Sequence, residues 1–408
     1  MENKAGFIWN TLGSLVYSFF NAILLVFCTR LNGTEIAGIF SICYATGCIL
    51  NAIGDMGIRI FQVTDTNRKY KLEDYLYSRI FSVVLMTIIA VIFVIISGYS
   101  NEKLFICLIL ILIRVVDNFS ETFQAEFQLN CRLDRAGKAL LYRNFLEIAV
   151  FAIFDIVTKN IYISFLSMLA VSIVILITYD LRLTNKQNKI KLNFNYENIK
   201  QIIKECFPLG ISTLISMYVI NAVKYAIDAF GDNTMQTYFN VLYMPTFVIN
   251  LISILIMKPL LKPFGEYWNN KDYKRFIKTI VYIILFLIGM TIIIEIGALL
   301  VGIPILSFIY AIDLSAYKME LFLLILSGLF YASSTVIFYA LGTIRRQKNT
   351  TIAYSISAVF ALIISNILVS KYGILGSTIS SVLIMLILFI SLSIFFVLGY
   401  RKEKLNRK

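Results

Sequence analysis

The sequence predicts an all-α membrane protein with twelve transmembrane helices, divided into two halves of six. Three observations support this fold class. Hydrophobic residues make up 59% of the 408 positions and charged residues only 15%, which is too few charges for an ordinary soluble domain. The apolar residues gather in segments near the roughly 20 residues that a helix needs to cross a bilayer. Lys and Arg are concentrated in alternate gaps between these segments.

Each apolar segment is predicted to form one membrane-spanning helix. The first is too long for the core of a signal peptide and lacks a small-residue cleavage site, so we expect it to remain as the first span. The twelve segments cover residues 7–28, 36–57, 80–98, 104–123, 141–157, 161–181, 207–229, 238–257, 279–303, 319–342, 351–370 and 376–398.

The positive charges predict the orientation. Thirty of the 37 Lys and Arg residues lie on the same side as the termini, at the termini, in the gaps or, for Arg143, at the start of the fifth segment. Because cytoplasmic loops carry an excess of positive charge, both termini are predicted to be cytoplasmic, in a multi-pass protein of the plasma membrane. The net charge of +13 is then explained by loops that contact the headgroups of the lipid bilayer, and we expect no nucleic-acid partner.

The longest polar stretch follows the sixth segment and divides the chain. We predict an N-terminal lobe at 1–183, a cytoplasmic linker at 184–206, a C-terminal lobe at 207–400 and a basic tail at 401–408. Apolar residues at helical spacing from Tyr196 to Cys206 predict a short amphipathic helix at the membrane surface within the linker. Because each lobe has an even number of spans, the two lobes would be related as a parallel repeat.

What the sequence lacks disfavours several activities. No loop is long enough to fold as a soluble catalytic domain, and the phosphate-loop pattern GxxxxGK[ST] is absent. The six cysteines form no CxxC pair and there is no histidine, so we expect no disulfide, no metal site and no cofactor. Coupling to a proton or a cation would then depend on carboxylates.

Ionisable residues inside the predicted spans are the candidates for function, because a charge at bilayer depth is unfavourable by roughly 2.5–3.5 kcal/mol on insertion scales. Asp55 and Arg59 lie four apart at the end of the second span, where we expect them to share one helix face. Arg114 and Asp117 lie three apart in the fourth span. Such pairs can also neutralise themselves and only line a wet groove, and Asp55 and Arg59 can be interfacial.

The later spans add further candidates. Lys224 and Asp228 lie four apart in the seventh span, and Glu295 stands alone in the ninth. Glu147 and Asp155, near the two ends of the fifth span, are expected at the membrane interfaces. Polar residues in the first two spans, Asn21 among them, add a hydrophilic face. Together these residues predict an aqueous, partly cationic cavity suited to an anionic substrate with a polar body.

Nine short stretches, taken in order, carry a likeness to a known family. They are Asn10–Ser14, Thr29–Leu31, Ala37–Phe40, Gly57–Asp65, Arg132–Lys138, Lys224–Asp228, Lys258–Leu261, Tyr339–Gly342 and Tyr372–Gly376. Their order and positions resemble those of Wzx-type oligosaccharide flippases, which belong to the multidrug/oligosaccharidyl-lipid/polysaccharide exporter superfamily. The likeness runs from residue 10 to residue 376 and so covers most of the chain.

The resemblance implies two six-helix lobes that form a V-shaped, alternating-access transporter. It implies that an undecaprenyl-pyrophosphate-linked oligosaccharide is moved from the inner to the outer leaflet for cell-surface polysaccharide synthesis, driven by an ion gradient. A polymerase and glycosyltransferases would act in the same pathway. Because a flippase makes and breaks no bond, the protein is not expected to be an enzyme.

Two sets of functional residues follow from the charges and the likeness together. The substrate-binding set is Arg59, Lys224, Arg114, Gln62 and Asn21, in which Arg59 and Lys224 contact the pyrophosphate. The ion-coupling set is Asp228, Asp55 and Glu295. Related sequences often have Asn-Ile-Pro-Arg where this chain has Asn221–Lys224, and a lysine keeps the charge but not the bidentate geometry of an arginine.

Two other functions remain open. A drug or metabolite exporter of the same superfamily would need an acid-rich cavity for cations, whereas the predicted cavity also carries Arg59, Arg114 and Lys224. A membrane glycan polymerase or ligase typically needs a long outer loop with catalytic groups, and the predicted outer loops are short.

Overall fold

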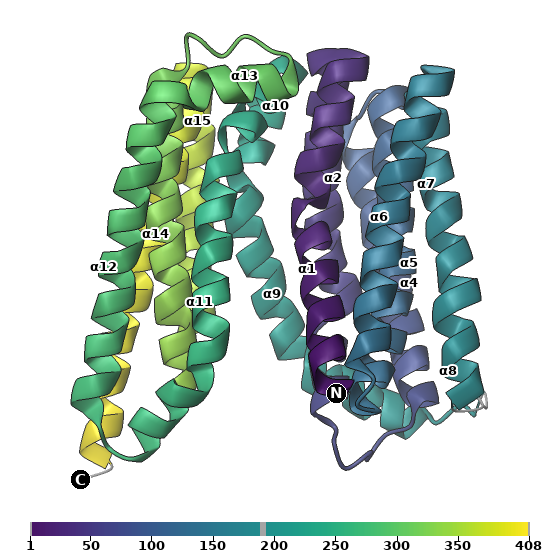
Figure 1. Ribbon diagram of the computed structural model, residues 1–408, viewed down its shortest axis with the longest axis vertical. Coiled ribbons are helices and arrows are strands. Elements are labelled where there is room, and N and C mark those ends of the chain that lie inside the picture. The colour runs from purple at the N-terminus through teal and green to yellow at the C-terminus, as the bar shows by residue number, and fades with distance from the viewer. Residues whose placement is uncertain (1, 188–192, 407–408) are drawn as a thin grey trace. The chain divides into compact units, whose positions relative to one another are not determined.

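The computed structural model describes residues 2–187 and 193–406, and every regular element within these ranges is a helix (Figure 1). The chain divides into two compact units, one that ends at Met217 and one that begins at Tyr218. The division falls inside a single helix, α9 (Tyr196–Phe230). It therefore lies later in the chain than the predicted start of the C-terminal lobe at residue 207.

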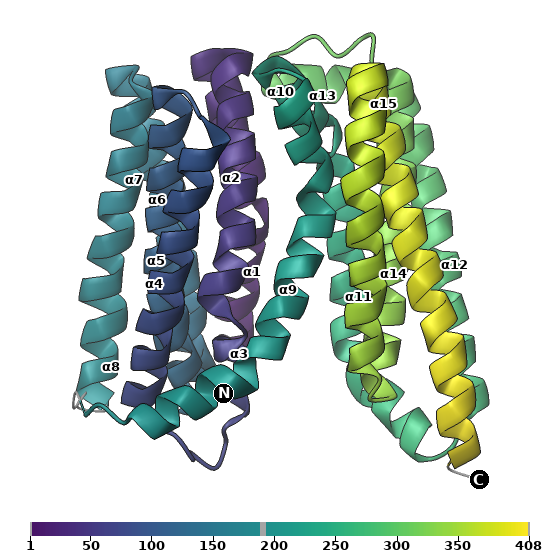
Figure 2. The same cartoon turned by 180° about the vertical axis from the view of Figure 1, so that it is seen from behind.

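Unit 1 is a bundle of long helices joined by short turns. Its elements are α1 (Glu2–Phe27), the π-helical turn η1 (Cys28–Asn32), α2 (Gly33–Asp55), α3 (Ile58–Thr64), α4 (Leu72–Ser97), α5 (Asn101–Leu129), α6 (Leu133–Thr158), α7 (Ile161–Ile175), the π-helical turn η2 (Leu176–Leu181), α8 (Arg182–Gln187) and the first half of α9. Helix α1 packs on α6, α2 packs on α4 and α5, and α6 packs on α7. Figure 2 shows this bundle from behind.

Unit 2 is a second helical bundle. Its elements are the second half of α9, α10 (Asn233–Leu242), α11 (Met244–Asn269), α12 (Tyr273–Gly297), the π-helical turn η3 (Ala298–Gly302), α13 (Ile303–Tyr310), α14 (Lys318–Thr343) and α15 (Gln347–Asn406). Helix α14 packs on α11, α12 and α15. Helix α15 is interrupted at Gly373, whose φ of 57° and ψ of −129° are not helical.

The described helices bear out a multi-pass membrane protein. Each of the twelve predicted segments overlaps a helix. Seven helices are long and apolar enough to cross a membrane, or eight if the bent pair α10 and α11 counts as one span. The number is lower than twelve because two continuous helical stretches, Gly6–Asp55 and Gln347–Lys402, each cover two predicted segments, and because α5 and α6 carry buried charges such as Arg114 and Arg143. The count of twelve spans stays a prediction.

Helix α9 joins the predicted surface helix to the predicted seventh span. It runs from Tyr196 to Phe230 without a break and contains Pro208. Its Ile202 and Cys206 are buried in a hydrophobic cluster with Met56, Ile58, Tyr70 and Tyr75. The first half of α9 therefore belongs to unit 1, because its apolar face packs on α3 and α4. Residues 188–192 of the predicted linker lie outside the described residues.

Two glycines bring α1 and α6 into backbone contact. A Cβ atom added at Gly137 would come within 2.4 Å of the backbone nitrogen of Asn10, and one added at Gly13 within 2.7 Å of the carbonyl oxygen of Gly137. Small residues at such positions let membrane helices approach closely. Gly13 and Gly137 belong to two of the stretches that carry the family likeness, and the fold places these stretches against each other.

Candidate functional site

The second predicted span is broken before Arg59. Helix α2 ends at Asp55 and α3 begins at Ile58. Met56 and Gly57 have φ values of 46° and 75°, in the left-handed region that commonly ends a helix. The prediction that Asp55 and Arg59 share one helix face is therefore wrong, because the break places them in different helices. The absent side chain of Gly57 also makes room for Leu209 of α9, which a Cβ would approach to 2.6 Å.

Arg79 of α4 holds this break together. Its side chain is fully buried, and Nη1 donates to the carbonyl oxygen of Gly54 at 2.8 Å and to Oδ1 of Asn118 at 2.8 Å. Nε donates to the hydroxyl of Thr122 at 3.0 Å, and Asp55 lies 3.4 Å from Nη1. Sequence reasoning assigned Arg79 to a cytoplasmic loop. It lies inside because α4 begins at Leu72, two turns before the predicted apolar segment.

Gln62 and Asn118 extend this network across α3, α2 and α5. Gln62 is fully buried, and its Nε2 donates to the carbonyl oxygen of Thr122 at 3.2 Å. Asn118 donates to Oδ1 of Asn51 at 2.7 Å. In this conformation Gln62 fastens α3 to α5, and its predicted contact with substrate stays a prediction.

A second buried network, which we call the arginine–carboxylate cluster, consists of Arg114, Asp117, Arg143 and Asp180. Arg114 lies 2.9 Å from Asp117, so the pair expected from its spacing is formed. Arg143 lies 3.4 Å from Asp117 and 2.9 Å from Asp180. The cluster thus joins α5, α6 and the π-helical turn η2 by ion pairs, in a region where charges are retained only with partners.

Two members of this cluster were missed by sequence reasoning. Arg143 was counted among the cytoplasmic charges, at the start of the predicted segment 141–157, but α6 begins at Leu133, so Arg143 lies two turns or more inside the helix. The signal for it is the run of polar residues Arg143, Asn144 and Glu147 at helical spacing, which marks a polar face. Asp180 lies in the sixth predicted segment, and nothing local indicates its partner.

Several polar atoms near the cluster are buried without a partner among the described residues. They are Nε of Arg143, Oδ1 of Asp180, Oε1 of Glu147 and the hydroxyl oxygen of Ser172. Glu147 and Asp155, expected at the membrane interfaces, are both buried within unit 1. Asp155 accepts hydrogen bonds from Asn32 at 2.7 Å and from Ser164 at 3.2 Å.

A polar recess opens beside the cluster. Its interior volume is about 20 Å³, roughly the space of one water molecule. Arg59 lies nearby in the fold, with a third of its side chain exposed and Nη1 3.8 Å from Glu121, one of the lining residues. The residues that line the recess are Tyr17, Asn51, Arg114, Asp117, Glu121, Gln124, Leu140, Arg143 and Asn144.

The charges around this recess are mixed. The sequence predicts a partly cationic cavity, and Arg59 and Arg114 are present as expected. Each of them, however, is paired with a carboxylate, Glu121 for Arg59 and Asp117 for Arg114. Asn21, the remaining predicted contact in unit 1, is half-buried on α1.

In unit 2, the predicted residues of the seventh span lie on the second half of α9. Lys224 and Asp228 are both half-buried, and Asn221 is 7% exposed. Their spacing of three and four residues places them along one face of the helix. The contact of Lys224 with substrate and the ion-coupling role of Asp228 stay predictions.

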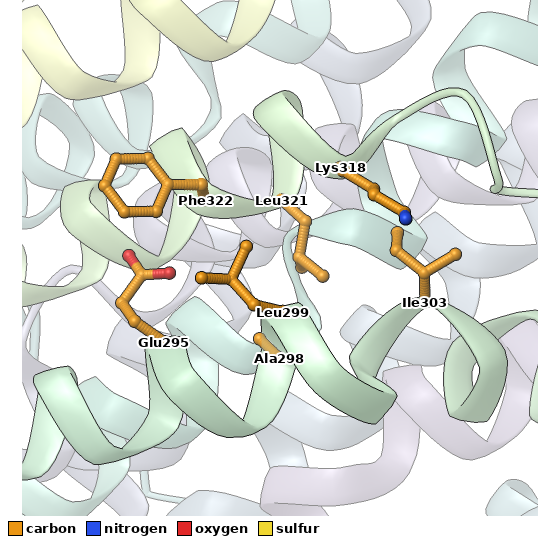
Figure 3. Close-up of a pocket in the computed structure, with 7 residues that line it drawn as sticks. All are labelled: Glu295, Ala298, Leu299, Ile303, Lys318, Leu321 and Phe322. Atoms are coloured by element: carbon orange, nitrogen blue, oxygen red, sulfur yellow. The ribbon is translucent and has the colours of Figure 1, made fainter.

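Glu295 lines an apolar pocket between α12 and α14. Figure 3 shows its carboxylate on the side of Phe322, whereas the ammonium group of Lys318 lies at the other end, near Ile303. The adjoining pocket has a volume of about 350 Å³, and Glu295 and Thr291 are its polar residues. Oε2 of Glu295 is buried without a partner among the described residues. Across the described ranges, no group of three or more acidic or cysteine residues is arranged to hold a metal ion.

The comparisons with known proteins concern the whole chain. No family model matches it. It is 25% identical over 388 residues to the capsular polysaccharide biosynthesis protein CapF of Staphylococcus aureus, a match that covers 92% of this chain and 93% of the relative.

The solved structures that are similar to the fold include a flippase and a multidrug transporter. The lipid II flippase MurJ, in an inward closed conformation, matches with a TM-score of 0.70 and 17% identity over 97% of this chain and 90% of the other. An inward-facing multidrug resistance MATE family transporter of the MOP superfamily matches with a TM-score of 0.61 and 14% identity, over 97% of this chain and 94% of the other. The chain therefore has the fold of these transporters, as the resemblance implies.

Proposed function

We propose that this protein moves a lipid-linked oligosaccharide from the inner to the outer leaflet, for the synthesis of a capsule or a related surface polysaccharide. The observation that carries the proposal is the polar network of unit 1, in which the buried Arg114 and Arg143 and the partly exposed Arg59 gather within an apolar helical bundle. The near full-length likeness to a capsular polysaccharide biosynthesis protein and the fold of a lipid II flippase support the same substrate class.

The physical need for such a site comes from the sugar. Transfer of a hydroxyl group from water into hydrocarbon without a hydrogen-bond partner is unfavourable by roughly 4–8 kcal/mol on alkane-type scales. A protein surface with amide, hydroxyl and charged groups replaces the lost water while the lipid tail stays in the bilayer. Asn51, Gln124 and Asn144 at the recess of unit 1 are groups of this kind.

Arg59 is the best placed candidate in unit 1 to contact the pyrophosphate. A third of its side chain is exposed, and its distance of 3.8 Å to Glu121 exceeds that of a hydrogen-bonded pair. It can therefore exchange Glu121 for a phosphate with little loss. Arg114 is 7% exposed and holds Asp117 at 2.9 Å, which supports a secondary role. Lys224 is the corresponding candidate in unit 2.

The three carboxylates proposed for ion coupling differ in their surroundings. Asp55 is engaged by Arg79 and by the backbone nitrogen of Gly57 at 3.2 Å, so it is the least available. Glu295 has a buried oxygen without a described partner, which supports exchange of a proton there. Asp228 is half-buried on α9. If Glu295 couples transport to protons, Glu295→Gln abolishes the dependence of transport on a pH gradient, whereas an unchanged dependence rejects this role.

A cation-coupled drug exporter is the second candidate. Acidic side chains near the recess, Asp117, Glu121 and Glu147, favour it because they would attract cationic drugs. The likeness to a multidrug resistance transporter points the same way. The polymerase or ligase alternative has no such support.

The test is transport by the purified protein in proteoliposomes. Lipid-linked oligosaccharide from the strain that carries the gene is placed in the membrane, and its arrival in the opposite leaflet is measured by access of a lectin or a glycosidase. We expect transfer that empty liposomes do not show. Transfer of ethidium in place of the lipid would favour the exporter, and lengthened glycans would favour the polymerase.

The proposed orientation has its own test. Single cysteines at Gln187 and Lys404, in a cysteine-free background, are treated in whole cells with a reagent that cannot cross the membrane. We expect no labelling until the cells are opened. Labelling in intact cells would place these positions outside.

A further inference from the structure

Unit 2 contains a second pocket that differs in chemistry from the one beside Glu295. It has a volume of about 320 Å³, at the lower end of the range for small-ligand sites. Leu261 of α11 forms one wall. The other lining residues come from the end of α14 and the start of α15, and they are Phe338, Tyr339, Gly342, Thr343, Gln347 and Thr350.

The wall of this pocket combines aromatic rings with neutral hydrogen-bonding groups. The rings of Phe338 and Tyr339 lie 5.6 Å apart at an angle of 78°, and Phe338 also makes an edge contact with Tyr354 at 6.4 Å. Such contacts hold rings in fixed orientations. The amide of Gln347 supplies donors and an acceptor. The hydroxyl groups of Thr343 and Thr350 donate to the carbonyl oxygens of Tyr339 and Gln347, so their oxygens supply acceptors.

This combination selects among the parts of a lipid-linked glycan. None of the described lining residues is charged, so the pocket lacks the cations that a pyrophosphate requires. A polyprenyl tail would leave the amide of Gln347 without a partner, which is unfavourable. A sugar ring fits both features, because its C–H face stacks on an aromatic ring while its hydroxyls bond to amide and hydroxyl groups.

The position of the pocket suits the first encounter with a sugar headgroup. Arg345, Arg346 and Lys348 lie in the turn between α14 and α15 and at the start of α15, beside Thr343 and Gln347. These charges are among those that predict the cytoplasmic side. The pocket therefore lies at the end of unit 2 that would face the compartment in which the lipid-linked sugar is made.

We infer that this pocket, formed by Phe338, Tyr339, Gly342, Thr343, Gln347 and Thr350, is a glycan subsite that binds a neutral sugar residue of the transported lipid. The inference rests on the proposed function and adds a separate place for recognition of the sugar. Selectivity for sugar-bearing over sugar-free lipid then depends on this pocket, whereas affinity for the pyrophosphate depends on cations elsewhere.

Gly342 provides a test that does not require removal of a packed side chain. A Cβ atom added there meets nothing within 4 Å, so Gly342→Leu fills the pocket without a clash at the helix. Gly289 of α12 is a matched control, because a Cβ atom there also meets nothing within 4 Å and Gly289 does not line the pocket. Both substitutions replace a helical glycine by leucine, so a general effect on folding or insertion would be shared.

The experiment measures binding of two probes to the protein in lipid nanodiscs. One is undecaprenyl pyrophosphate, and the other is the same lipid carrying the oligosaccharide from the strain that carries the gene. Two net hydrogen bonds to the sugar correspond to roughly tenfold tighter binding of the second probe. We expect a tenfold ratio of the two affinities in the wild type and in the control variant Gly289→Leu. In Gly342→Leu we expect a ratio near one.

Each outcome decides the inference. A tenfold ratio that survives in Gly342→Leu overturns the glycan subsite but leaves the proposed function intact. An equal loss of affinity for both probes in Gly342→Leu also overturns the glycan subsite, since the pocket would then bind the lipid. If the wild type binds neither probe and does not transport the sugar-bearing lipid, the proposed function fails and the subsite falls with it. Gln347→Ala is expected to lower the ratio in the same direction.

Discussion

The buried guanidinium group of Arg79 donates a hydrogen bond of 2.8 Å to the carbonyl oxygen of Gly54, the penultimate residue of α2. The last carbonyl groups of a helix have no partner within it. Arg79 supplies one from a neighbouring helix, and it also reaches Asp55. The carbonyl end of α2 thereby gains a partner, and α3, which carries Arg59 and Gln62, begins as a separate helix.

Replacement of Arg79 is therefore expected to destabilise unit 1. Arg79→Ala removes the donor to Oδ1 of Asn118 and the cation beside Asp55. The carbonyl of Gly54 then keeps only the hydroxyl of Ser82 as a donor. The loss of stability should approach the roughly 3–5 kcal/mol of a broken buried ion pair. The stability of Arg79→Lys should lie between that of the wild type and that of Arg79→Ala. Thermal unfolding of the detergent-solubilised protein measures the effect. As a control, Arg275→Ala removes an exposed pair with Asp272 and should change stability by about 1 kcal/mol or less.

Arg59→Ala should impair export more than abundance. The lost contact with the pyrophosphate is worth roughly 1.5–3 kcal/mol, or about tenfold or more in activity. The readout is surface polysaccharide in a deletion strain complemented with each variant, normalised to protein in the membrane. Arg132→Ala, which removes an arginine paired with Asp134, serves as the matched control. Wild-type export by Arg59→Ala at equal abundance would refute its proposed role.

Lys224 gives a parallel prediction for unit 2. Lys224→Ala should lower export by about tenfold or more, on the same scale of a charge-assisted contact. Lys224→Arg should retain much of the activity, since the charge survives. Lys262→Ala, at a side chain that is 87% exposed, should export normally. If both the alanine and the arginine variants of Lys224 act like the wild type, its contact with the substrate is excluded.

The contact between α1 and α6 predicts opposite effects for one substitution at two sites. Gly137→Ala forces a Cβ against the backbone of Asn10, so the helices must separate and the melting temperature should fall. Gly289→Ala meets no atom within 4 Å and should stabilise its helix by about 0.5–1 kcal/mol, since glycine is unfavourable there. Equal melting temperatures for the two variants would contradict the close approach.

The hydrogen bonds that Asp65 accepts predict a dependence of stability on pH. Burial opposes ionisation of its carboxyl, but hydrogen bonds from the backbone nitrogens of Tyr70 and Lys69 and from the hydroxyl of Tyr75 outweigh it and lower the pKa. A lowered pKa in the folded state stabilises the protein at pH values above the unfolded-state pKa of about 3.9. This stabilisation is lost as the pH falls through the folded-state pKa.

The matching variant is Asp65→Asn. It should melt at a lower temperature than the wild type at pH 7, and the difference should shrink as the pH falls below about 4. Melting curves of both proteins over this range provide the measurement. A difference that stays constant with pH would show that the carboxylate charge does not stabilise this loop.

Much of the fold and part of the site could be predicted from the sequence by itself. Apolar segments determine where helices form, because each residue contributes its own transfer free energy to the membrane. The pair of Arg114 and Asp117 follows from a spacing of three, since one helical turn brings these side chains together whatever surrounds them.

Only the tertiary structure decided the rest. Arg79 and Arg143 lie at the cytoplasmic edges of predicted apolar segments, yet they are buried, because partners from other helices, such as Asn118 and Asp180, compensate for their charge. The break after Asp55 likewise depends on Arg79, which lies 24 residues away in the chain. Burial of a charge is set by groups that folding brings together, and a local pattern carries no information about them.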